Sequence, residues 1–307
     1  MIDASIIILN YNGKSYLKNC LTSIFENTHN ITFEVILVDN ASTDQSVEFV
    51  KGEFSAVRVI ENKENVGFAK GNNIGVEQAK GEYIIILNND TIVLPNAINN
   101  LISFMKKEPI KMIVTGKVLK FKRHFESNCG RFPTFLSEYL YFGFFLIRYI
   151  KNPYSQKFRI KTWERDKLQE IDWVSGCYFA IKKDEMLKLN GFDENFFLYY
   201  EDVDLCYRFR NSGGRVLYYP QSVIKHLKGG TSQTDFLKAI SINYKSAIYY
   251  FTKICGKFNA KILNLLIKIT WLLDIIALSV LDISTFLKYS KIKKKLKLLN
   301  YLLGVKI

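Results

Sequence analysis

The sequence has 307 residues, a formal net charge of +14, 48% hydrophobic residues and 23% charged residues. These values exclude an intrinsically disordered chain and allow one large α/β domain with an appendage, or two domains. Residues 251–307 hold eleven Lys and two Asp, so the excess charge is concentrated in the tail. A nucleic-acid-binding protein is therefore disfavoured, and we expect no nucleic-acid partner.

The cysteines also limit the class of protein. They are Cys20, Cys129, Cys177, Cys206 and Cys255, an odd number with no CxxC pair. A disulfide framework or a zinc site is therefore not expected, and a reducing compartment fits best. A predicted strand begins within a few residues of Met1, which leaves no room for a signal peptide. We expect a cytoplasmic protein.

The first hundred residues alternate between apolar strands and helices. Strands are predicted at 4–13, 33–43, 56–62 and 82–91, and helices at 14–28, 44–54 and 67–81. This alternation predicts an α/β fold with a mostly parallel sheet that helices cover on both faces. Gly67, Gly71 and Gly75 are spaced by four residues, which predicts close packing of one helix face on the sheet.

Each of the four predicted strands ends in polar residues. They are Asn10, Tyr11 and Asn12; Asp39, Asn40 and Ser42; Glu61, Asn62 and Lys63; and Asn88, Asn89 and Asp90. A single exit of this kind is an ordinary turn, because Asn and Asp cap their own backbone. Four such exits at the carboxyl edge of one parallel sheet favour a ligand site. The chain has neither GxGxxG after its first strand nor GxxxxGK[ST], so a typical dinucleotide or P-loop site is excluded.

The second half is less regular. A helix is predicted after Asn96 and a strand at 111–119, whereas residues 121–170 are aromatic-rich and receive no assignment. Residues 171–183 are predicted as one further strand. The segment 191–214 is predicted as a loop that enters a helix, and 215–226 as a last strand that ends at His226.

Seven stretches in this order resemble the family-2 inverting glycosyltransferases of the GT-A fold, in particular their rhamnosyltransferase-like branch. They are SIIILNYN, VILVDNASTD, NVGFAKGNNIG, YIIILNNDT, WVSGCYFAIKK, GFDENFFLYYEDVDLCYRFRNSGG and VIKHLKGGTS. The resemblance covers about residues 3–232. It implies a GT-A domain, Rossmann-like, at 1–234, with a nucleotide-binding half at 1–100 and an acceptor half at 101–234.

The resemblance implies a nucleotide-diphosphate sugar donor and a divalent metal ion, Mn²⁺ or Mg²⁺. The implied donor-binding residues are Asn10, Tyr11, Asp39, Lys70, Asn73, Asn88, Asn89 and Asp90. The strand that ends at Asp90 carries Asn-Asn-Asp where the family has DxD, so only the last position is acidic. The metal ligands implied are Asp90 and His226; His226 could otherwise be an ordinary loop histidine.

The resemblance also assigns the chemistry. It makes Asp202 the general base and places Glu201 in contact with the acceptor, while Trp173, Ser175 and Gly176 line the sugar pocket. Each assignment has a structural alternative. Acids in a first helical turn stabilise the helix dipole, Asp204 and Arg208 have the spacing of a surface ion pair, and Trp173 could be a core residue.

The function implied is metal-dependent inverting transfer of rhamnose or another hexose to a glycan or lipid-linked acceptor in bacterial surface polysaccharide synthesis. The alternatives are a non-catalytic module that binds nucleotide sugars or glycans, and a nucleotidyltransferase of related fold. A nucleotidyltransferase should carry a glycine-rich loop after its first strand, where this chain has NYNGKS. A glycoside hydrolase would use paired carboxylates without a nucleotide pocket.

The tail at 235–307 is predicted as a helical, basic segment on the membrane surface. Lys268 and Asp274 interrupt its apolar stretch, and Lys261, Asn264, Lys268, Ser279 and Asp282 fall in one sector of a helical wheel. A spanning helix would carry each central charge at a cost of about 2.5–3.5 kcal/mol. Residues 288–297 add six Lys, which favour an anionic membrane surface at the inner face of the cell membrane. A helical subdomain or a homodimer contact is the alternative.

Overall fold

The structure, a computed structural model, describes residues 2–120, 128–143, 166–227 and 236–282. The chain divides into two units. The sheet unit comprises Met1–Phe132 and Thr162–Gln233, and the helical unit comprises Pro133–Lys161 and Thr234–Ile307. The further division of the first 234 residues into a nucleotide-binding half and an acceptor half stays a prediction.

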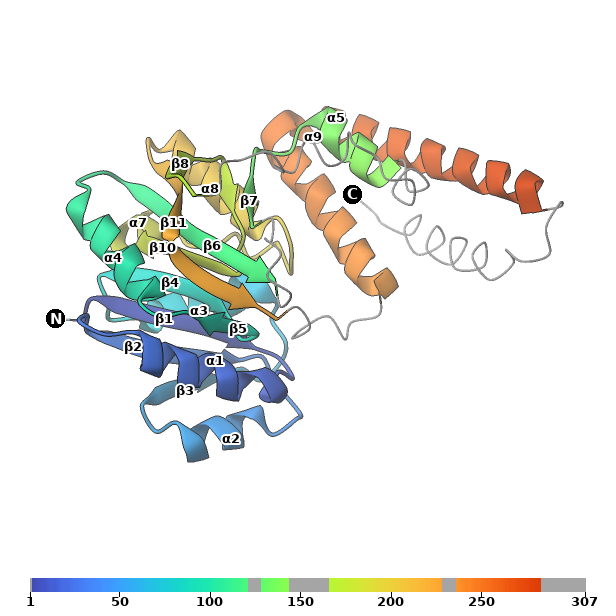
Figure 1. Ribbon diagram of the computed structural model, residues 1–307. Coiled ribbons are helices and arrows are strands. Elements are labelled where there is room, and N and C mark those ends of the chain that lie inside the picture. The colour runs from blue at the N-terminus through green and yellow to red at the C-terminus, as the bar shows by residue number, and fades with distance from the viewer. Residues whose placement is uncertain (1, 121–127, 144–165, 228–235, 283–307) are drawn as a thin grey trace. The chain divides into compact units, whose positions relative to one another are not determined.

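The first half of the sheet unit follows the predicted alternation (Figure 1). Its elements are β1 (Ala4–Asn10), α1 (Lys14–Asn27), β2 (Phe33–Asp39), α2 (Ser46–Glu53), β3 (Val57–Glu61), α3 (Phe68–Gln78), β4 (Tyr83–Asn88), β5 (Thr91–Val93), α4 (Ala97–Lys107) and β6 (Met112–Lys120). The short strand β5 follows the polar exit of β4 after a tight turn.

The second half of the sheet unit departs from the prediction in two places. Its elements are β7 (Cys129–Gly130), β8 (Gln169–Glu170), β9 (Trp173–Val174), β10 (Tyr178–Lys182), α7 (Lys183–Lys188), α8 (Glu201–Asn211) and β11 (Arg215–His226). The single strand predicted at 171–183 is wrong, because a turn at Gly176 and Cys177 separates β9 from β10. Helix α7 was not predicted.

The strands form a nine-stranded sheet with the order β3-β2-β1-β4-β10-β6-β11-β5, and β8 pairs with β11. β1, β2, β3 and β4 run parallel, and β6 and β11 are parallel to each other. β10 is antiparallel to both of its neighbours. The prediction of a mostly parallel sheet is confirmed. β7 and β9 form a separate two-stranded ribbon.

Helices cover both faces of this sheet. One core cluster contains Ile6 and Ile8 of β1 together with buried residues of α1 and α4. On the other face α3 lies against β1, because a Cβ atom added at Gly75 would be 2.5 Å from Cγ2 of Ile7, and one at Gly71 would be 2.4 Å from Cδ1 of Leu9. The close packing predicted from the glycine spacing is therefore present at Gly71 and Gly75, whereas Gly67 precedes the helix and a Cβ atom added there would meet Phe197.

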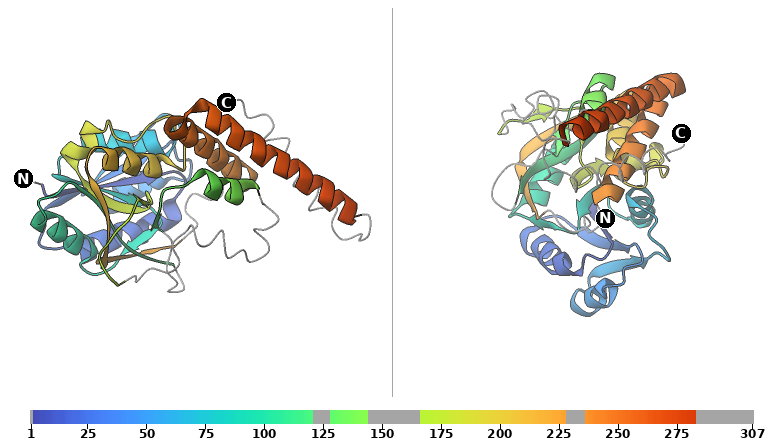
Figure 2. Two further views of the ribbon diagram at one scale, coloured as in Figure 1. Left: turned by 90° about the horizontal axis from the view of Figure 1, so that it is seen from above. Right: turned by 90° about the vertical axis from the view of Figure 1, so that its right-hand side faces the viewer.

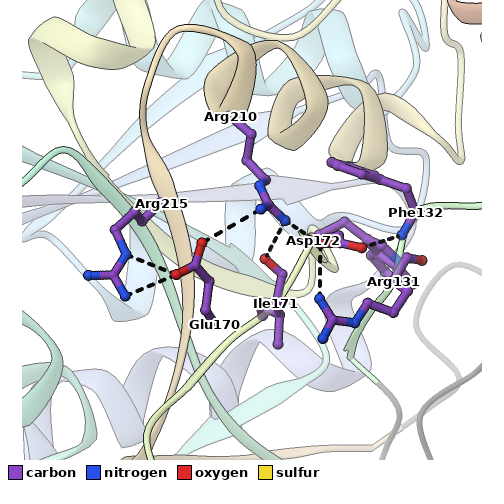
Figure 3. A network of polar contacts seen from close by, with 8 residues as sticks. Arg131, Phe132, Glu170, Ile171, Asp172, Arg210 and Arg215 are labelled. Atoms are coloured by element: carbon purple, nitrogen blue, oxygen red, sulfur yellow. Dashed lines mark hydrogen bonds and ion pairs between the residues drawn. The ribbon is translucent and has the colours of Figure 1, made fainter.

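An ion-pair network joins the segment that precedes β9 to helix α8 (Figure 3). Arg210 of α8 donates to the carboxylate of Asp172 and lies 3.6 Å from that of Glu170. Arg131 donates to Asp172 at 3.3 Å, and Arg215 bonds to Glu170 at 3.0 Å. The chain that leads into Gly176 is thereby fixed to the helix that begins at Glu201.

The helical unit contains α5 (Phe135–Glu138), the π-helix η1 (Tyr139–Gly143) and α9 (Phe236–Asp282). Gly256, with φ of 82°, bends α9 into two arms (Figure 2). Tyr244 of the first arm donates to Asn264 of the second, which is buried. Asn264, which lies in the polar sector of the helical wheel, therefore has its hydrogen-bond partner inside the unit. Among the described residues, no helix is both long and apolar enough to span a bilayer.

Candidate active site

The carboxyl edge of the sheet is held together by one buried amide. Asn10, at the end of β1, is fully buried. Its Nδ2 donates to Oδ1 of Asp39 at 2.8 Å and to Oγ of Ser42 at 3.1 Å, and its Oδ1 accepts from Nδ2 of Asn89 at 2.7 Å. The polar exits of three neighbouring strands therefore meet at one point, as their positions in the sequence predict.

Asp39 uses its carboxylate inside this edge. Its Oδ1 accepts from Oγ of Ser42 at 2.6 Å, and its Oδ2 accepts from the Ser42 N–H at 2.8 Å. The residue is only 2% exposed, whereas the neighbouring Tyr11 is 36% exposed. These bonds fix the loop after β2. The predicted contact of Asp39 with a donor stays a prediction.

Asp90 and His226, the predicted metal ligands, lie together. β5 pairs with β11 so that His226 is opposite Thr91, and the N–H of Leu227 donates to the carbonyl of Asp90 at 2.8 Å. Nε2 of His226 is 3.0 Å from Oδ1 of Asp90. Both side chains are mostly buried, with 13% and 6% of their surface exposed.

The pair fits a divalent cation. The observed 3.0 Å separation is that of a direct ion-pair contact between the two side chains, and it also equals the distance between two ligands that lie about 2.1 Å from one ion at right angles. Within the part of the chain that the structure describes, no group of three or more His, Cys, Asp or Glu side chains could hold a metal ion. Asp90 and His226 would thus supply two ligands, and a bound diphosphate and water would have to supply the others.

The two remaining donor residues predicted at this edge are more accessible. Asn88 is half-buried; its N–H donates to the carbonyl of Cys177 at 3.0 Å, and its carbonyl accepts from the Thr91 hydroxyl at 2.7 Å. Lys70 lies exposed on α3.

Asn73, predicted to bind the nucleotide, is bonded to the loop 191–200. Its Nδ2 donates to the carbonyl of Phe192 at 2.9 Å and to Oε1 of Glu194 at 3.1 Å. Its Oδ1 accepts from the N–H of Phe192 at 2.9 Å. This buried amide therefore anchors the loop that precedes α8, whatever else it contacts.

Asp202 lies in the first turn of α8, and both of its carboxylate oxygens accept backbone N–H groups. Oδ2 accepts from Gly176 and Oδ1 from Val203, each at 2.8 Å. Burial raises the pKa of Asp202 from its ordinary value of 3.8 to about 6, although the two N–H groups oppose that rise. At pH 7 the carboxylate is mostly ionised and is a stronger base than an exposed one.

Glu201 sits beside it in a different state. The residue is 4% exposed, and its Oε2 has no hydrogen-bond partner. Burial, and then the charge of Asp202, raise the pKa of Glu201 well above its ordinary value. A neutral carboxylic acid is the form that tolerates such surroundings. The two carboxyl groups are neighbours and titrate as a pair, in which the charge on one raises the pKa of the other.

The next acid of this helix is structural. Asp204 was predicted to form a surface pair with Arg208, but Asp204 is only 1% exposed. Its Oδ2 accepts from Nε of Arg208 at 2.7 Å, and the same guanidinium donates to the carbonyls of Leu189 and Gly191. The surface assignment is wrong because this side of α8 packs on the segment after α7. The spacing of the pair was correct.

Gly176 connects Asp202 to the metal-ligand pair. Its N–H binds Asp202, and the carbonyl of the following Cys177 accepts the N–H of Asn88. Asn88 stands two residues before Asp90. The proposed base and the proposed metal ligands are therefore linked through one short backbone segment, between the end of β4, the start of β10 and the start of α8.

Phe68 is a site residue that sequence reasoning missed. A Cβ atom added at Gly176 would lie 2.8 Å from the Phe68 ring and 3.9 Å from Oδ2 of Asp202. Phe68 opens α3 and is partly exposed. The signal available in the sequence was an aromatic residue at the start of a helix that follows a polar strand exit.

The predicted pocket residues Trp173 and Ser175 contact the β7 segment. Nε1 of Trp173 donates to the carbonyl of Arg131 at 2.9 Å. The N–H of Ser175 donates to the carbonyl of Asn128 at 2.7 Å, and its Oγ accepts from the N–H of Cys177 at 3.3 Å. These bonds shape the turn that presents Gly176 to Asp202.

The loop 191–200 enters α8 through two strained residues. Tyr199 and Tyr200 have φ of 71° and 68°, in the left-handed region. This conformation costs a non-glycine residue about 1–2 kcal/mol. Such strain persists where surrounding contacts impose it, and it is frequent beside functional groups. Here it directly precedes Glu201 and Asp202.

The chain matches two known families in sequence. Residues 5–164 match the family described as Glycosyl transferase family 2, and residues 165–229 match that described as N-terminal domain of galactosyltransferase. Rhamnosyltransferase WbbL of Escherichia coli K12 is 24% identical over 259 residues, which cover 81% of this chain and 92% of that protein. The N-acetylglucosaminyl-diphospho-decaprenol L-rhamnosyltransferase of Mycobacterium tuberculosis H37Rv is 23% identical, over 80% of this chain and 82% of that protein.

Solved structures share the fold. GalNAc-T7, in a crystal structure with UDP, GalNAc and Mn²⁺, has a TM-score of 0.57 and 18% identity, over 84% of this chain and 51% of that one. TarS 1–349 of S. aureus in complex with UDP has a TM-score of 0.52 and 16% identity, over 80% of this chain and 66% of that one. This chain thus spans about half of the GalNAc-T7 chain. The likeness confirms the predicted GT-A fold.

Proposed function

Because this chain belongs to glycosyl transferase family 2 and is a glycosyltransferase, we propose that it moves rhamnose or another hexose from a nucleotide-diphosphate sugar to a glycan or lipid-linked acceptor by inverting transfer. The observation that carries the proposal is the backbone link at Gly176. It joins a base of raised pKa, Asp202, to the Asp90–His226 pair through neighbouring strand ends. A role in bacterial surface polysaccharide synthesis is part of the proposal, since the two rhamnosyltransferase relatives are bacterial proteins.

Transfer proceeds in one displacement. Asp202 takes the proton of the acceptor hydroxyl as that oxygen attacks the anomeric carbon of the donor sugar. The bond from the anomeric carbon to the diphosphate oxygen breaks, and its electron pair leaves with the diphosphate. Each oxygen of Asp202 keeps a second lone pair beside the one that holds Gly176 or Val203, so the carboxylate can accept the proton without leaving its position. Attack opposite the leaving group inverts the anomeric configuration.

Asp90 and His226 would hold Mn²⁺ or Mg²⁺. Such an ion supplies positive charge to the departing diphosphate when it is bound. The accessible residues Tyr11, Lys70 and Asn88 are the proposed direct donor contacts. Asn10, Asp39 and Asn89 are proposed to act mainly by shaping this edge, and Asn73 by anchoring the loop 191–200, because the structure commits their side chains to internal hydrogen bonds.

A donor screen tests the proposal. The full chain is incubated with Mn²⁺ and a panel of nucleotide-diphosphate sugars, with and without saccharide acceptors, and release of nucleoside diphosphate is measured. We expect release from at least one donor, and loss of that release in Asp202→Asn. Tight donor binding without release from any donor would favour the non-catalytic module instead.

We further propose that the helical unit binds an anionic membrane surface, which would make the protein peripheral at the inner face of the membrane. Phe258, Leu265, Ile269 and Leu272 follow one face of the second arm of α9, and they are 75%, 58%, 44% and 52% exposed. Exposed apolar stripes of this kind indicate a membrane or protein contact. Lys257 and Lys261, both exposed, lie on either side of Phe258 at the start of this apolar stripe. The six Lys of 288–297 lie outside the described residues.

Liposome flotation distinguishes the membrane from a homodimer contact. The full chain should float with vesicles that contain anionic lipid and much less with neutral ones, and Leu265→Ser with Leu272→Ser should weaken both. A protein that floats with neither, and whose mass in solution falls from dimer to monomer in this double variant, would assign the stripe to a second copy.

A further inference from the structure

We propose that the exposed rings of Phe197 and Tyr199, in the loop 191–200, form a stacking surface for a pyranose ring of the acceptor saccharide. The inference rests on the proposed function and adds a binding surface to it.

Exposed aromatic side chains are few in the sheet unit. Over the residues that the structure describes there, the Phe, Tyr and Trp side chains at least 36% exposed are Tyr11, Phe197 and Tyr199. Tyr11 follows β1, at the proposed donor edge. Phe197 and Tyr199 are 43% and 36% exposed and lie just before Asp202. Water-exposed rings beside a catalytic group are typical of a surface that a ligand covers.

The loop that carries them is fixed from both sides. Asn73 binds the backbone of Phe192, and the N–H of Phe68 donates to the carbonyl of Phe197 at 2.6 Å. Phe196 is buried, with 1% of its surface exposed, so it anchors the loop from below while its neighbour Phe197 faces outward. A rigid loop can present an aromatic ring at little cost in ordering when a ligand binds.

Glycine is required where this loop meets α3. Gly67 has φ of 87°, and a Cβ atom added there would lie 2.5 Å from the carbonyl oxygen and 2.8 Å from a ring carbon of Phe197. The Phe197 ring is therefore held against the start of α3. Tyr199, with φ of 71°, adopts a backbone conformation that a tyrosine disfavours. The strained turn directs the chain into α8. A role in binding for the ring of Tyr199 would explain why a tyrosine occupies this strained position.

Phe197 is linked to the reacting group through a short chain of contacts, and Tyr199 precedes Asp202 by three positions. Phe197 touches Gly67 and bonds to the N–H of Phe68, the Phe68 ring lies against Gly176, and Gly176 binds Asp202. The hydroxyl that Asp202 deprotonates belongs to the acceptor, and the loop leads directly into Asp202, which favours the acceptor over the nucleotide as the molecule that covers these rings. A pyranose ring has an apolar face of C–H groups and a rim of hydroxyls, which suits Phe197 as a flat apolar partner and Tyr199 as a ring with a polar end.

Saturation-transfer NMR on the full chain, with UDP and Mn²⁺ present, tests the proposal. The probes are the methyl glycosides of N-acetylglucosamine, galactose, glucose and rhamnose. Saturation should pass from the wild-type protein to the ring C–H protons of at least one probe. Phe197→Ala and Tyr199→Ala should each raise the dissociation constant of that probe about tenfold. Phe197→Tyr and Tyr199→Phe keep the rings and should bind as wild type does. Leu187→Ala, which removes an exposed apolar side chain from α7, is the matched control.

The outcomes separate this inference from the proposed function. Calorimetry of UDP with Mn²⁺ should be unchanged in all of these variants. If the alanine variants lost UDP affinity and kept glycoside affinity, the rings would serve the nucleobase, and the proposal would be wrong. It is also wrong if no probe binds wild type, or if the alanine variants bind it equally well. Absence of diphosphate release from every donor would instead contradict the proposed function, irrespective of glycoside binding.

Discussion

Asp202→Asn keeps the shape of the side chain and removes its basicity. With Asp202 as the general base, transfer should fall by about two to four orders of magnitude, the range that general-base catalysis contributes. The donor should bind nearly as before, because the contacts of Asp202 are with Gly176, with Val203 and, in the proposal, with the acceptor.

The structure also predicts what this change does to stability. The raised pKa means that the folded state binds the proton of Asp202 more tightly than the unfolded chain does, so wild type loses stability as pH rises from 3.8 to about 6. At pH 7 this loss reaches about 3 kcal/mol, since one pKa unit corresponds to about 1.4 kcal/mol. Asparagine removes the charge but leaves one of the two N–H groups without an acceptor. The buried unsatisfied N–H group destabilises the folded state by about 1–3 kcal/mol. The two effects nearly cancel, and the variant should be about as stable as wild type.

Asp204→Asn is the matched control, two positions away from Asp202 on the same helix. It breaks a buried pair with Arg208, which typically costs about 3–5 kcal/mol. Its melting temperature should fall clearly, while the folded fraction keeps its transfer rate. The two asparagine variants should thus have opposite effects. Asp202→Asn should lose transfer rate and keep stability, whereas Asp204→Asn should lose stability and keep transfer rate.

The assay is diphosphate release with donor and acceptor at saturation, together with thermal melts and calorimetric donor binding. A tenfold or smaller loss of rate in Asp202→Asn would refute its assignment as the base. A folded Asp204→Asn that is inactive, beside an active Asp202→Asn, would exchange the two roles.

Three further predictions address the pH dependence, the metal and the ion-pair network. Because the pKa of Asp202 is about 6, the transfer rate should fall about tenfold per pH unit below pH 6 and level off above pH 7, and a flat profile of diphosphate release from pH 4.5 to 8 would contradict this. Asp90→Asn and His226→Gln should each weaken Mn²⁺-dependent UDP binding at least tenfold in calorimetry, with unchanged binding of UDP alone; equal affinity with Mn²⁺ would remove the pair from the metal site. Asp172→Ala deprives Arg131 and Arg210 of their shared carboxylate and should lower the free energy of unfolding by about 1–3 kcal/mol in denaturant titrations, whereas no change would show that the network is not stabilising.

The first half of the fold could be predicted from the sequence because its signals are local. Short β-branched strands, helical spacing and polar exits each fall within a dozen residues, and a parallel sheet brings all its exits to one edge. That is why Asn10, Asp39 and Asn89 were expected near one another and are hydrogen-bonded in the structure. The pairing of Asp90 with His226 came from the resemblance, since the two residues are 136 positions apart in the sequence and the β5–β11 pairing brings them together.

The second half resisted prediction because its signals depend on tertiary contacts. The apolar run 171–183 has the composition of one strand, but the turn at Gly176 forms through bonds to Asn128 and Asp202, which are distant in sequence. The spacing of Asp204 and Arg208 cannot tell a buried pair from a surface pair. Asn264 has the polarity of a water-facing residue, and only the fold of α9 back on itself supplies its partner Tyr244.

The anomeric configuration of the product tests the central claim most directly. The donor found in the screen is incubated with the full chain and a saccharide acceptor, and the anomeric configuration of the new linkage is determined by NMR. Direct displacement with Asp202 as base predicts a configuration opposite to that of the donor, with one nucleoside diphosphate released for each linkage formed. Retention of the donor configuration would contradict the single displacement and the role of Asp202.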